Sequence, residues 1–292
     1  ALAEDRDVRL VELVLPDTGK FAVIGYLQSF LQGGIGTYLY HFYDDNCATR
    51  IRDLIDLATD GAFASWALSQ PAEGTMRTLT GEYMRHRPFT AWVLNALQGP
   101  SVDQPISRWE AMALPLELEQ AVHDFYLEEV GVSVHEEVLQ HAKQPNGQGR
   151  STAAQTIILA LALFATLQLL SLTAPTFKRI LLGVLYLFLG VLGSVLLFMM
   201  VASDMDMTFG NVNIIILNPL LLFAALRMFN SRTEGKSWLM TCFFFATAAL
   251  VLLQPLIGQE NLATLLVLLP LYLSGAAFQR RPKIKERKGN EL

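Results

Sequence analysis

The sequence predicts two parts of different fold class: a mostly helical α+β domain that folds in water, and an all-α bundle of five transmembrane helices. The chain has 292 residues, of which 52% are hydrophobic, and its mean hydropathy is +0.35, which is too apolar for an ordinary soluble protein. The apolar excess is confined to residues 151–279, whereas residues 1–150 mix charged, polar and apolar side chains. This change of composition predicts one part in water and one in lipid.

The composition divides the chain into four consecutive regions. We expect a water-soluble domain at 1–143, a polar linker (QPNGQGRS) at 144–151, a membrane domain at 152–279 and a basic tail at 280–292. The formal net charge of −5 gives no basic footprint for nucleic acid. The expected partner is therefore the membrane, with no nucleic acid.

The elements of the first part follow from its residue patterns. Apolar and polar residues alternate over Val8–Pro16, which predicts a strand, and Asp17 begins a helix that extends to Gln32. That helix has an apolar face made of Phe21, Ile24, Leu27, Phe30 and Leu31. A short strand or extended lead-in (TYLYHFY) comes next, and then a helix that follows Asn46 and ends before Gly61. Further helices are expected over Ala62–Ser69, Leu79–Ala96, Trp109–Met112 and Pro115–Glu129, with a loop at 98–107.

Five segments of the second part are apolar enough to cross a bilayer, which takes about 20 residues per helix. They are Ala153–Thr173, Ile180–Ala202, Val212–Phe229, Ser237–Leu256 and Leu262–Phe278. Asn218 and Pro219 interrupt the third segment, where polar backbone groups released from the helix need other partners.

Lysine and arginine are segregated between alternate loops of the membrane part. They occur after the first segment (Lys178, Arg179), after the third (Arg227, Arg232, Lys236) and in the tail QRRPKIKERKGNEL. The other two loops, SDMDMTFGNVN and QPLIGQEN, contain neither residue. The positive-inside rule then predicts a multi-pass protein of the inner membrane with a cytoplasmic tail and a periplasmic first domain.

Polar residues collect at the outward ends of the predicted membrane helices. They are Asp204, Asp206, Asn211, Asn213, Asn218, Gln254, Glu260 and Asn261. Polar groups at membrane depth often mark a site, and Asn213 and Asn218 are the foremost candidates to bind a lipid headgroup or ester carbonyl. The alternative is structural, because Asn218 precedes Pro219 and its amide can satisfy a carbonyl that the proline leaves unbonded.

Cys47 is one of only two cysteines, and it stands at the start of a predicted helix. The positive end of the helix dipole and nearby Arg50 and Arg52 favour the thiolate, which is the nucleophilic form. Two cysteines, Cys47 and Cys242, cannot form a disulfide framework, and Cys242 lies in an apolar run. A catalytic thiol and an inert buried cysteine both remain possible from spacing alone.

The runs YHFYDDNCATRIRDLID, GTMRTLT and PISRWEAMALPLEL resemble the Lnb family of bacterial lipoprotein N-acyltransferases. The run NVNIIILNPL is similar to that family's Asn-rich entry into a transmembrane helix. The resemblance covers roughly residues 5–130 well and the membrane part loosely. Its most specific portion is the Asn-Cys-x-Thr-Arg-x-Arg-Asp core, which places the family motif on Asn46, Cys47, Thr49, Arg50, Arg52 and Asp53.

The resemblance implies a rearranged papain-like thiol fold, in which the cysteine opens a helix and a histidine comes from a strand. That order places the histidine before the cysteine, where this sequence offers only His41. We expect the family histidine to precede residue 1, with His41 as the candidate base inside the chain. Thr78 stands about where some relatives have a histidine.

The implied reaction moves an acyl chain from a phospholipid to the α-amino group of a lipoprotein's lipidated N-terminal cysteine. Cys47 would carry the chain as a thioester, a histidine would act as base, and the Cys47 N–H with the Asn46 side chain would stabilise the oxyanion. No metal-ligand spacing occurs, so we expect neither metal nor cofactor. A membrane-tethered thiol hydrolase of lipid esters or cell-wall peptides, and a non-enzymatic membrane scaffold, remain the alternatives.

Overall fold

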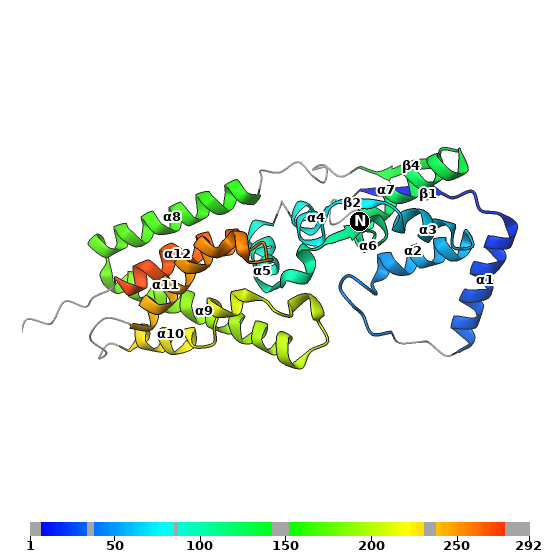
Figure 1. Cartoon of the computed structure of the whole chain (residues 1–292). Helices are drawn as coiled ribbons and strands as arrows, with labels where there is room; N and C mark the ends of the chain where they lie inside the picture. Colours follow the sequence, from blue (N-terminus) through cyan, green and yellow to red (C-terminus); the bar gives the residue numbers. More distant parts are fainter. Residues whose placement is uncertain (1–6, 34–37, 85–86, 142–151, 231–237, 278–292) are drawn as a thin grey trace, which may run out of the picture. The chain divides into compact units, whose positions relative to one another are not determined.

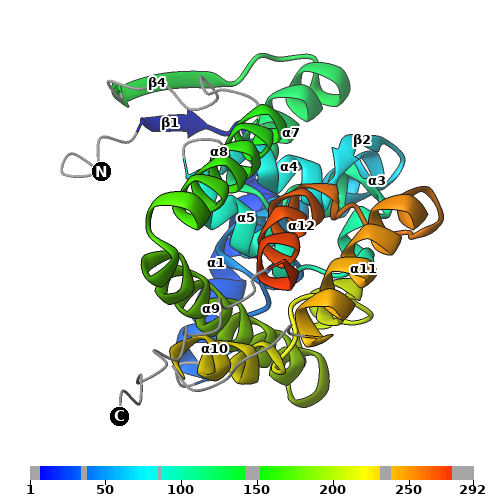
Figure 2. The same cartoon turned by 90° about the vertical axis from the view of Figure 1, so that its left-hand side faces the viewer.

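The computed structural model of the chain describes residues 7–33, 38–84, 87–141, 152–230 and 238–277 (Figure 1). The chain divides into two compact units, and each is considered by itself below. The first contains residues up to 86 and 102–149, and the second contains 87–101 and everything from 150 onward. Most described residues in both units are helical, as the sequence predicts (Figures 1 and 2).

The first unit combines short helices with two antiparallel strand pairs. Its elements are β1 (Val8–Glu12), α1 (Asp17–Gln32), α2 (Cys47–Ala58), α3 (Ala62–Leu68), β2 (Pro71–Thr75), α4 (Met76–Tyr83), β3 (Pro105–Ser107), α6 (Arg108–Ala111), α7 (Pro115–Phe125), a π-helical turn η3 (Tyr126–Val130) and β4 (His135–Gln140). A 3₁₀ turn η2 (Pro100–Asp103) lies at its boundary with the second unit. β1 pairs with β4, and β2 pairs with β3.

An aromatic cluster forms the core of the first unit. The rings of Phe63, Trp66 and Phe125 lie with centroids 5.1–6.0 Å apart, mostly edge to face. Ala48 and Ile55 place the buried face of α2 on the same cluster. Because apolar burial of this kind is the main stabilising contribution to a fold, the cluster fixes the helix that begins with Cys47.

Helix α1 has the predicted bounds, but its apolar face is not buried. Only Gly19 is buried, and it approaches the backbone carbonyl of Ala58 so closely that no side chain fits between the two helices. Every residue of α1 from Ile24 to Gln32 is exposed. The apolar periodicity therefore predicts the helix correctly. It does not predict what packs against the apolar face, which no described residue buries.

The single helix expected over Leu79–Ala96 is wrong, because two helices occupy this region. α4 ends at Tyr83, and α5 (Pro88–Leu97) begins with a proline at its first position, where proline's lack of an N–H costs nothing. α5 belongs to the second unit together with the rest of 87–101. The sequence does not predict this, because its composition does not change at either end of the segment.

The second unit is all-helical in its described residues. Beside α5, its elements are α8 (Thr152–Thr173), α9 (Pro175–Ala202), the 3₁₀ turns η4 (Asp206–Thr208) and η5 (Val212–Ile215), α10 (Leu221–Phe229), α11 (Trp238–Leu253), the 3₁₀ turn η6 (Gln254–Leu256) and α12 (Leu262–Ala276). Three described stretches are long and apolar enough to cross a membrane: Thr156–Thr173, Pro175–Ala202 and Trp238–Leu256. The apolar α12 is shorter, with 15 residues.

The third predicted span is not a continuous helix, which corrects the expectation of five regular spans. The region consists of η5, a turn around Asn218 and the nine-residue α10. Backbone groups released by this break find partners inside the unit, because the Asn218 amide donates to Ile214 O at 3.1 Å and Tyr272 OH donates to Ile216 O at 2.7 Å. Irregular backbone at membrane depth is stable only when it is satisfied in this way.

Candidate functional site

Cys47 is the first residue of α2, and its side chain is exposed and free of any disulfide. Asn46 is the N-cap, and its extended backbone conformation lets the chain enter the helix from the turn at 41–45. The first position of the helix turns the thiol outward, while Ala48 and Thr49 are buried. The local sequence therefore produces an accessible thiol on a rigid support, and the inert buried cysteine is not what the structure has.

A capping box fixes the turn that carries Cys47. The Asn46 side-chain oxygen accepts the N–H groups of Ala48 (2.8 Å) and Thr49 (3.0 Å), and Thr49 Oγ1 accepts the Asn46 N–H at 2.8 Å. Both amide hydrogens of Asn46 are also used, since its Nδ2 donates to Phe42 O (2.9 Å) and Ala113 O (3.0 Å). Asn46 thus attaches the turn to a segment 67 residues away, and in this arrangement its amide is not free for an oxyanion.

The remaining N–H group of this helix start belongs to Cys47 itself. The N–H groups of Asn46, Ala48, Thr49 and Arg50 all have acceptors within the turn. Among the residues that the structure describes, neither the N–H nor the thiol of Cys47 makes a hydrogen bond. A free N–H beside the nucleophile, at the positive end of a helix, is suited to stabilise an oxyanion that forms on an attacked carbonyl.

The two arginines behind Cys47 are both paired with carboxylates. Arg50 donates from Nε and one terminal nitrogen to Asp45, each at 2.6 Å, and its guanidinium lies 4.6 Å from the Tyr38 ring centroid. The hydrogen bond with Asp45 raises the pKa of Arg50 above its usual value. Arg52 is buried, donates to Asp53 at 2.9 Å, and stacks over Trp109 at 4.0 Å. Both cations therefore hold α2 in place through contacts with carboxylates and aromatic rings.

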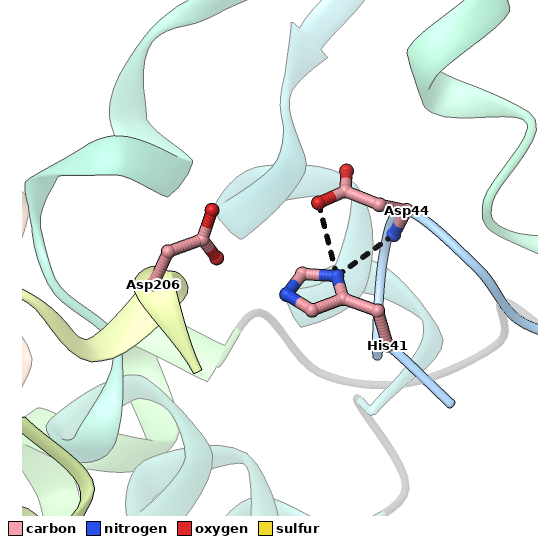
Figure 3. A group of neighbouring side chains, drawn as sticks. All are labelled: His41, Asp44 and Asp206. Atoms are coloured by element: carbon pink, nitrogen blue, oxygen red, sulfur yellow. Dashed lines mark hydrogen bonds and ion pairs between the residues drawn. The ribbon is translucent and has the colours of Figure 1, made fainter. Parts of the chain in front are cut away.

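His41 and Asp44 lie together in the turn that precedes Cys47 (Figure 3). His41 Nδ1 is 3.0 Å from the Asp44 N–H and 3.0 Å from the Asp44 carboxylate. These contacts are alternatives, because Nδ1 either accepts the N–H or carries a proton for the carboxylate. In the second arrangement Nε2 has a lone pair and the carboxylate orients the ring. Asp206, drawn in the same view, belongs to the second unit.

The sequence analysis does not identify some of the residues that shape this site. Asp45 pairs with Arg50, and Trp109 both stacks on Arg52 and accepts its N–H through the backbone carbonyl at 3.1 Å. Asn46 also donates to the backbone carbonyl of Ala113. Every residue has such a carbonyl, so the sequence does not indicate that Ala113 is the partner. The i, i+5 spacing of Asp45 and Arg50 could have indicated their pairing across the helix start.

The amides proposed to bind lipid are used for structure within the second unit. Asn213 is fully buried, donates to Ala96 O at 3.0 Å and accepts from Asn261 at 2.8 Å. Asn218 donates to Ile214 O and accepts the N–H of Leu220 at 3.0 Å. The geometry favours the structural alternative, in which these side chains satisfy backbone groups.

One other cluster of the first unit has the residue types of a cation site. Ligand atoms of Glu119, His123 and Glu136 lie within 4.8 Å of one another. Arg9 already supplies a cation there, since its Nε is 2.7 Å from Glu119 and 3.7 Å from Glu136. The cluster therefore joins β1 and β4 to α7 through ion pairs, and we assign no metal to it.

Two family models match the chain. One, described as the Lnb N-terminal periplasmic domain, covers residues 2–82, and the other, described as the Lnb transmembrane domain, covers residues 148–280. Comparison with curated proteins and with solved structures gave no match. The protein is thus a membrane protein with a periplasmic N-terminal domain. Because both models match in succession, one on each side of the change in composition, the chain belongs to the Lnb family.

Proposed function

We propose that this protein is a lipoprotein N-acyltransferase that uses Cys47 as its nucleophile. The observation that carries the proposal is the exposed thiol at the first position of α2, next to an N–H group without an acceptor in the described chain. Family membership supports an enzyme of this kind, since the resemblance of residues 46–53 implies that activity. The acyl donor is a phospholipid and the acceptor is a lipidated lipoprotein.

The first step forms a thioester. The Cys47 thiolate attacks the ester carbonyl carbon of the phospholipid, and the Cys47 N–H stabilises the oxyanion of the tetrahedral intermediate. The C–S bond forms in this attack, and the acyl C–O bond breaks when the intermediate collapses to the thioester. The leaving alkoxide takes a proton from the imidazolium that received it from the thiol, and a lysophospholipid departs. Within this chain His41, oriented by Asp44, is the candidate for that base.

The second step transfers the chain to nitrogen. The α-amino group of the lipoprotein attacks the thioester carbonyl, a C–N bond forms, the C–S bond breaks, and Cys47 leaves as thiolate. The base takes the proton that the amine loses. A thioester suits this exchange, because an amine opens it readily whereas water attacks it more slowly.

The remaining expectations belong to the same proposal. The papain-like arrangement of the thiol domain, five crossings, placement in the inner membrane and a cytoplasmic C-terminus agree with the resemblance and with the segregation of Lys and Arg. Thr49 and Asp53 act here as positioning residues, because Thr49 closes the capping box and Asp53 pairs with Arg52.

The test uses the full chain in vesicles that contain a phospholipid with an isotopically heavy acyl chain and a purified diacylated lipoprotein. We expect heavy acyl groups on Cys47 as a hydroxylamine-sensitive thioester, and then on the lipoprotein as an amide, both detected by mass spectrometry. Cys47→Ser should lose at least a hundredfold in rate. Cys242→Ser is the matched control, because that cysteine is also exposed but lies within α11.

Other outcomes separate the alternatives. Free heavy fatty acid without acylated lipoprotein would identify a thiol hydrolase. Normal transfer by Cys47→Ser would exclude Cys47 as the nucleophile, and activity in neither form of the protein would favour a scaffold.

A further inference from the structure

Helix α1 presents an apolar face that no described part of the chain covers. Ile24, Leu27 and Leu31 follow the i, i+3, i+7 spacing of one helix face, and Phe30 lies beside them. The exposed fractions of Phe30 and Leu31 are 44% and 73%. Side chains of this size are seldom exposed together on a soluble domain, and such a patch generally marks an interaction surface.

The composition of α1 distinguishes it from an ordinary surface helix. Its two charged residues, Asp17 and Lys20, stand in the first turn and pair with each other at 3.1 Å. No charged residue occurs from Phe21 to Gln32, and the face opposite the apolar one carries Ser29 and Gly25. This helix therefore has an apolar face and a polar face without the charges that keep most exposed helices in water.

The position of α1 connects it with Cys47. The helix contacts α2 near its own start, where Gly19 meets the carbonyl of Ala58, and the remainder extends away from α2 (Figure 1). The chain then returns through Tyr38, Leu39 and Tyr40, which are also exposed, directly to the turn before Cys47. The apolar surface thus continues along the sequence to the residue proposed as nucleophile.

The covalent chain indicates what covers this surface. Residues pass without a break from the second unit at Ser101 to the first unit at Val102, and the second unit contains the helices that cross the membrane. The two units are also joined between residues 86 and 87 and through residues 142–151, a stretch that can extend only about 35 Å. The first unit is therefore always held at the bilayer, and the most abundant apolar partner within its reach is lipid.

We infer that α1 is an interfacial helix that lies in the outer surface of the bilayer, with Ile24, Leu27, Phe30 and Leu31 among the acyl chains. The exposed portion, nine residues long, measures about 13 Å, too short to span the hydrocarbon core of about 30 Å but sufficient to lie along its surface. Helices of this type insert their apolar face to the boundary between headgroups and acyl chains. The helix would hold the Cys47 domain at the depth of the lipid esters, although the inference does not require acyl transfer.

The test places a nitroxide label on either face of α1 in the full chain, in a Cys47→Ser/Cys242→Ser background reconstituted into phosphatidylethanolamine–phosphatidylglycerol vesicles. Leu27→Cys puts the label on the apolar face, and Ser29→Cys puts the matched label on the opposite face. Oxygen collects in the acyl region and a nickel chelate stays in water, so the ratio of the two collision rates measures depth. We expect at least a fivefold higher oxygen-to-nickel ratio at residue 27 than at residue 29.

Two outcomes would overturn the inference. Equal, high nickel access at both labels would show that α1 lies in water. A label at residue 27 that is immobile and shielded from both reagents would show a protein partner, and spin dilution with unlabelled protein would identify a second copy. The pair Phe30→Cys and Gly25→Cys repeats the measurement if the first pair folds poorly, because Gly25 is exposed on the opposite face and has room for a side chain. Because no readout uses catalysis, failure here leaves the proposed acyl transfer untouched.

Discussion

At the scale of single residues, the site depends on one side chain that uses all its hydrogen-bonding capacity. Asn46 accepts two N–H groups of α2 and donates to two carbonyls, one of them in the segment before α7. A sequence pattern can identify the cap, because Asn is among the residues preferred at an N-cap. It cannot identify Ala113 as the partner, since a backbone carbonyl is the same for every residue type.

Replacing Asn46 should loosen the start of α2 and displace Cys47. Asn46→Ala removes the cap, for which the expected cost is about 1 kcal/mol, and leaves the carbonyl of Ala113 without its donor. Local opening should then become at least about fivefold more frequent. Hydrogen exchange of the peptide that covers 47–58 measures this. Asn46→Ser keeps an acceptor, so its exchange rate should lie between those of the wild-type protein and Asn46→Ala. Unchanged exchange in Asn46→Ala would contradict the role of Asn46 as the cap of α2.

At the scale of elements, several boundaries could be predicted from the sequence and others could not. The bounds of α1 and the start of α2 follow from periodicity and capping residues. The break before Pro88 was missed, although proline at a first helical position is a recognisable signal. β4 was also missed, because four charged or polar residues among its six mask any alternation, and it exists only through pairing with β1.

The sequence does not predict that residues 87–101 pack within the second unit. Their carbonyls at Ala96 and Gln98 accept hydrogen bonds from the amides of Asn211, Asn213 and Gln259 at 3.0 Å. Two of the three donors, Asn211 and Asn213, lie among the polar residues that the sequence suggests for a lipid site. An amide side chain can form the same hydrogen bonds with a backbone carbonyl of the protein or with a lipid. The sequence alone therefore does not distinguish a structural role from lipid binding.

Asn213→Ala should therefore reduce stability and leave chemistry intact. The change removes a bond to Ala96 and leaves the buried Asn261 amide without its acceptor, at an expected cost of about 1–3 kcal/mol. Asn218→Ala should cost less, because its contacts are local and partly exposed. Thermal unfolding of the detergent-purified protein gives the ranking. Slower formation of the Cys47 thioester at unchanged stability would instead return both residues to a lipid site.

At the scale of the whole molecule, the membrane part combines long and short helices. Three described stretches are long enough to cross, whereas α12 with 15 residues is about 22 Å long and α10 with nine residues about 13 Å. The hydropathy pattern counts apolar residues and does not register that Asn218 and Pro219 divide the third segment. α10 and α12 are shorter than the hydrocarbon core, so each can cross the bilayer only together with its flanking turns or where the bilayer is locally thinner.

The predicted orientation can be measured directly. Lys and Arg lie in alternate loops and in the tail, so a cysteine introduced at Arg287 in a Cys47→Ser/Cys242→Ser background should face the cytoplasm. A membrane-impermeant maleimide should leave it unlabelled in intact cells and label it after the inner membrane is opened. Ser69→Cys, on the exposed surface after α3, is the matched outward control. Labelling of residue 287 in cells whose inner membrane is intact would invert the topology.

The assignment of residues 87–101 to the second unit has a consequence for how the protein is made. The ribosome completes this segment about fifty residues before it begins α8, and its amide donors follow still later, at sequence separations of 115, 117 and 161. The Ala96 and Gln98 carbonyls must meanwhile find water or a chaperone as temporary partners. Folding of the second unit is then complete only when α5, which is synthesised earlier, binds to the later helices. This step requires that translation has passed Gln259.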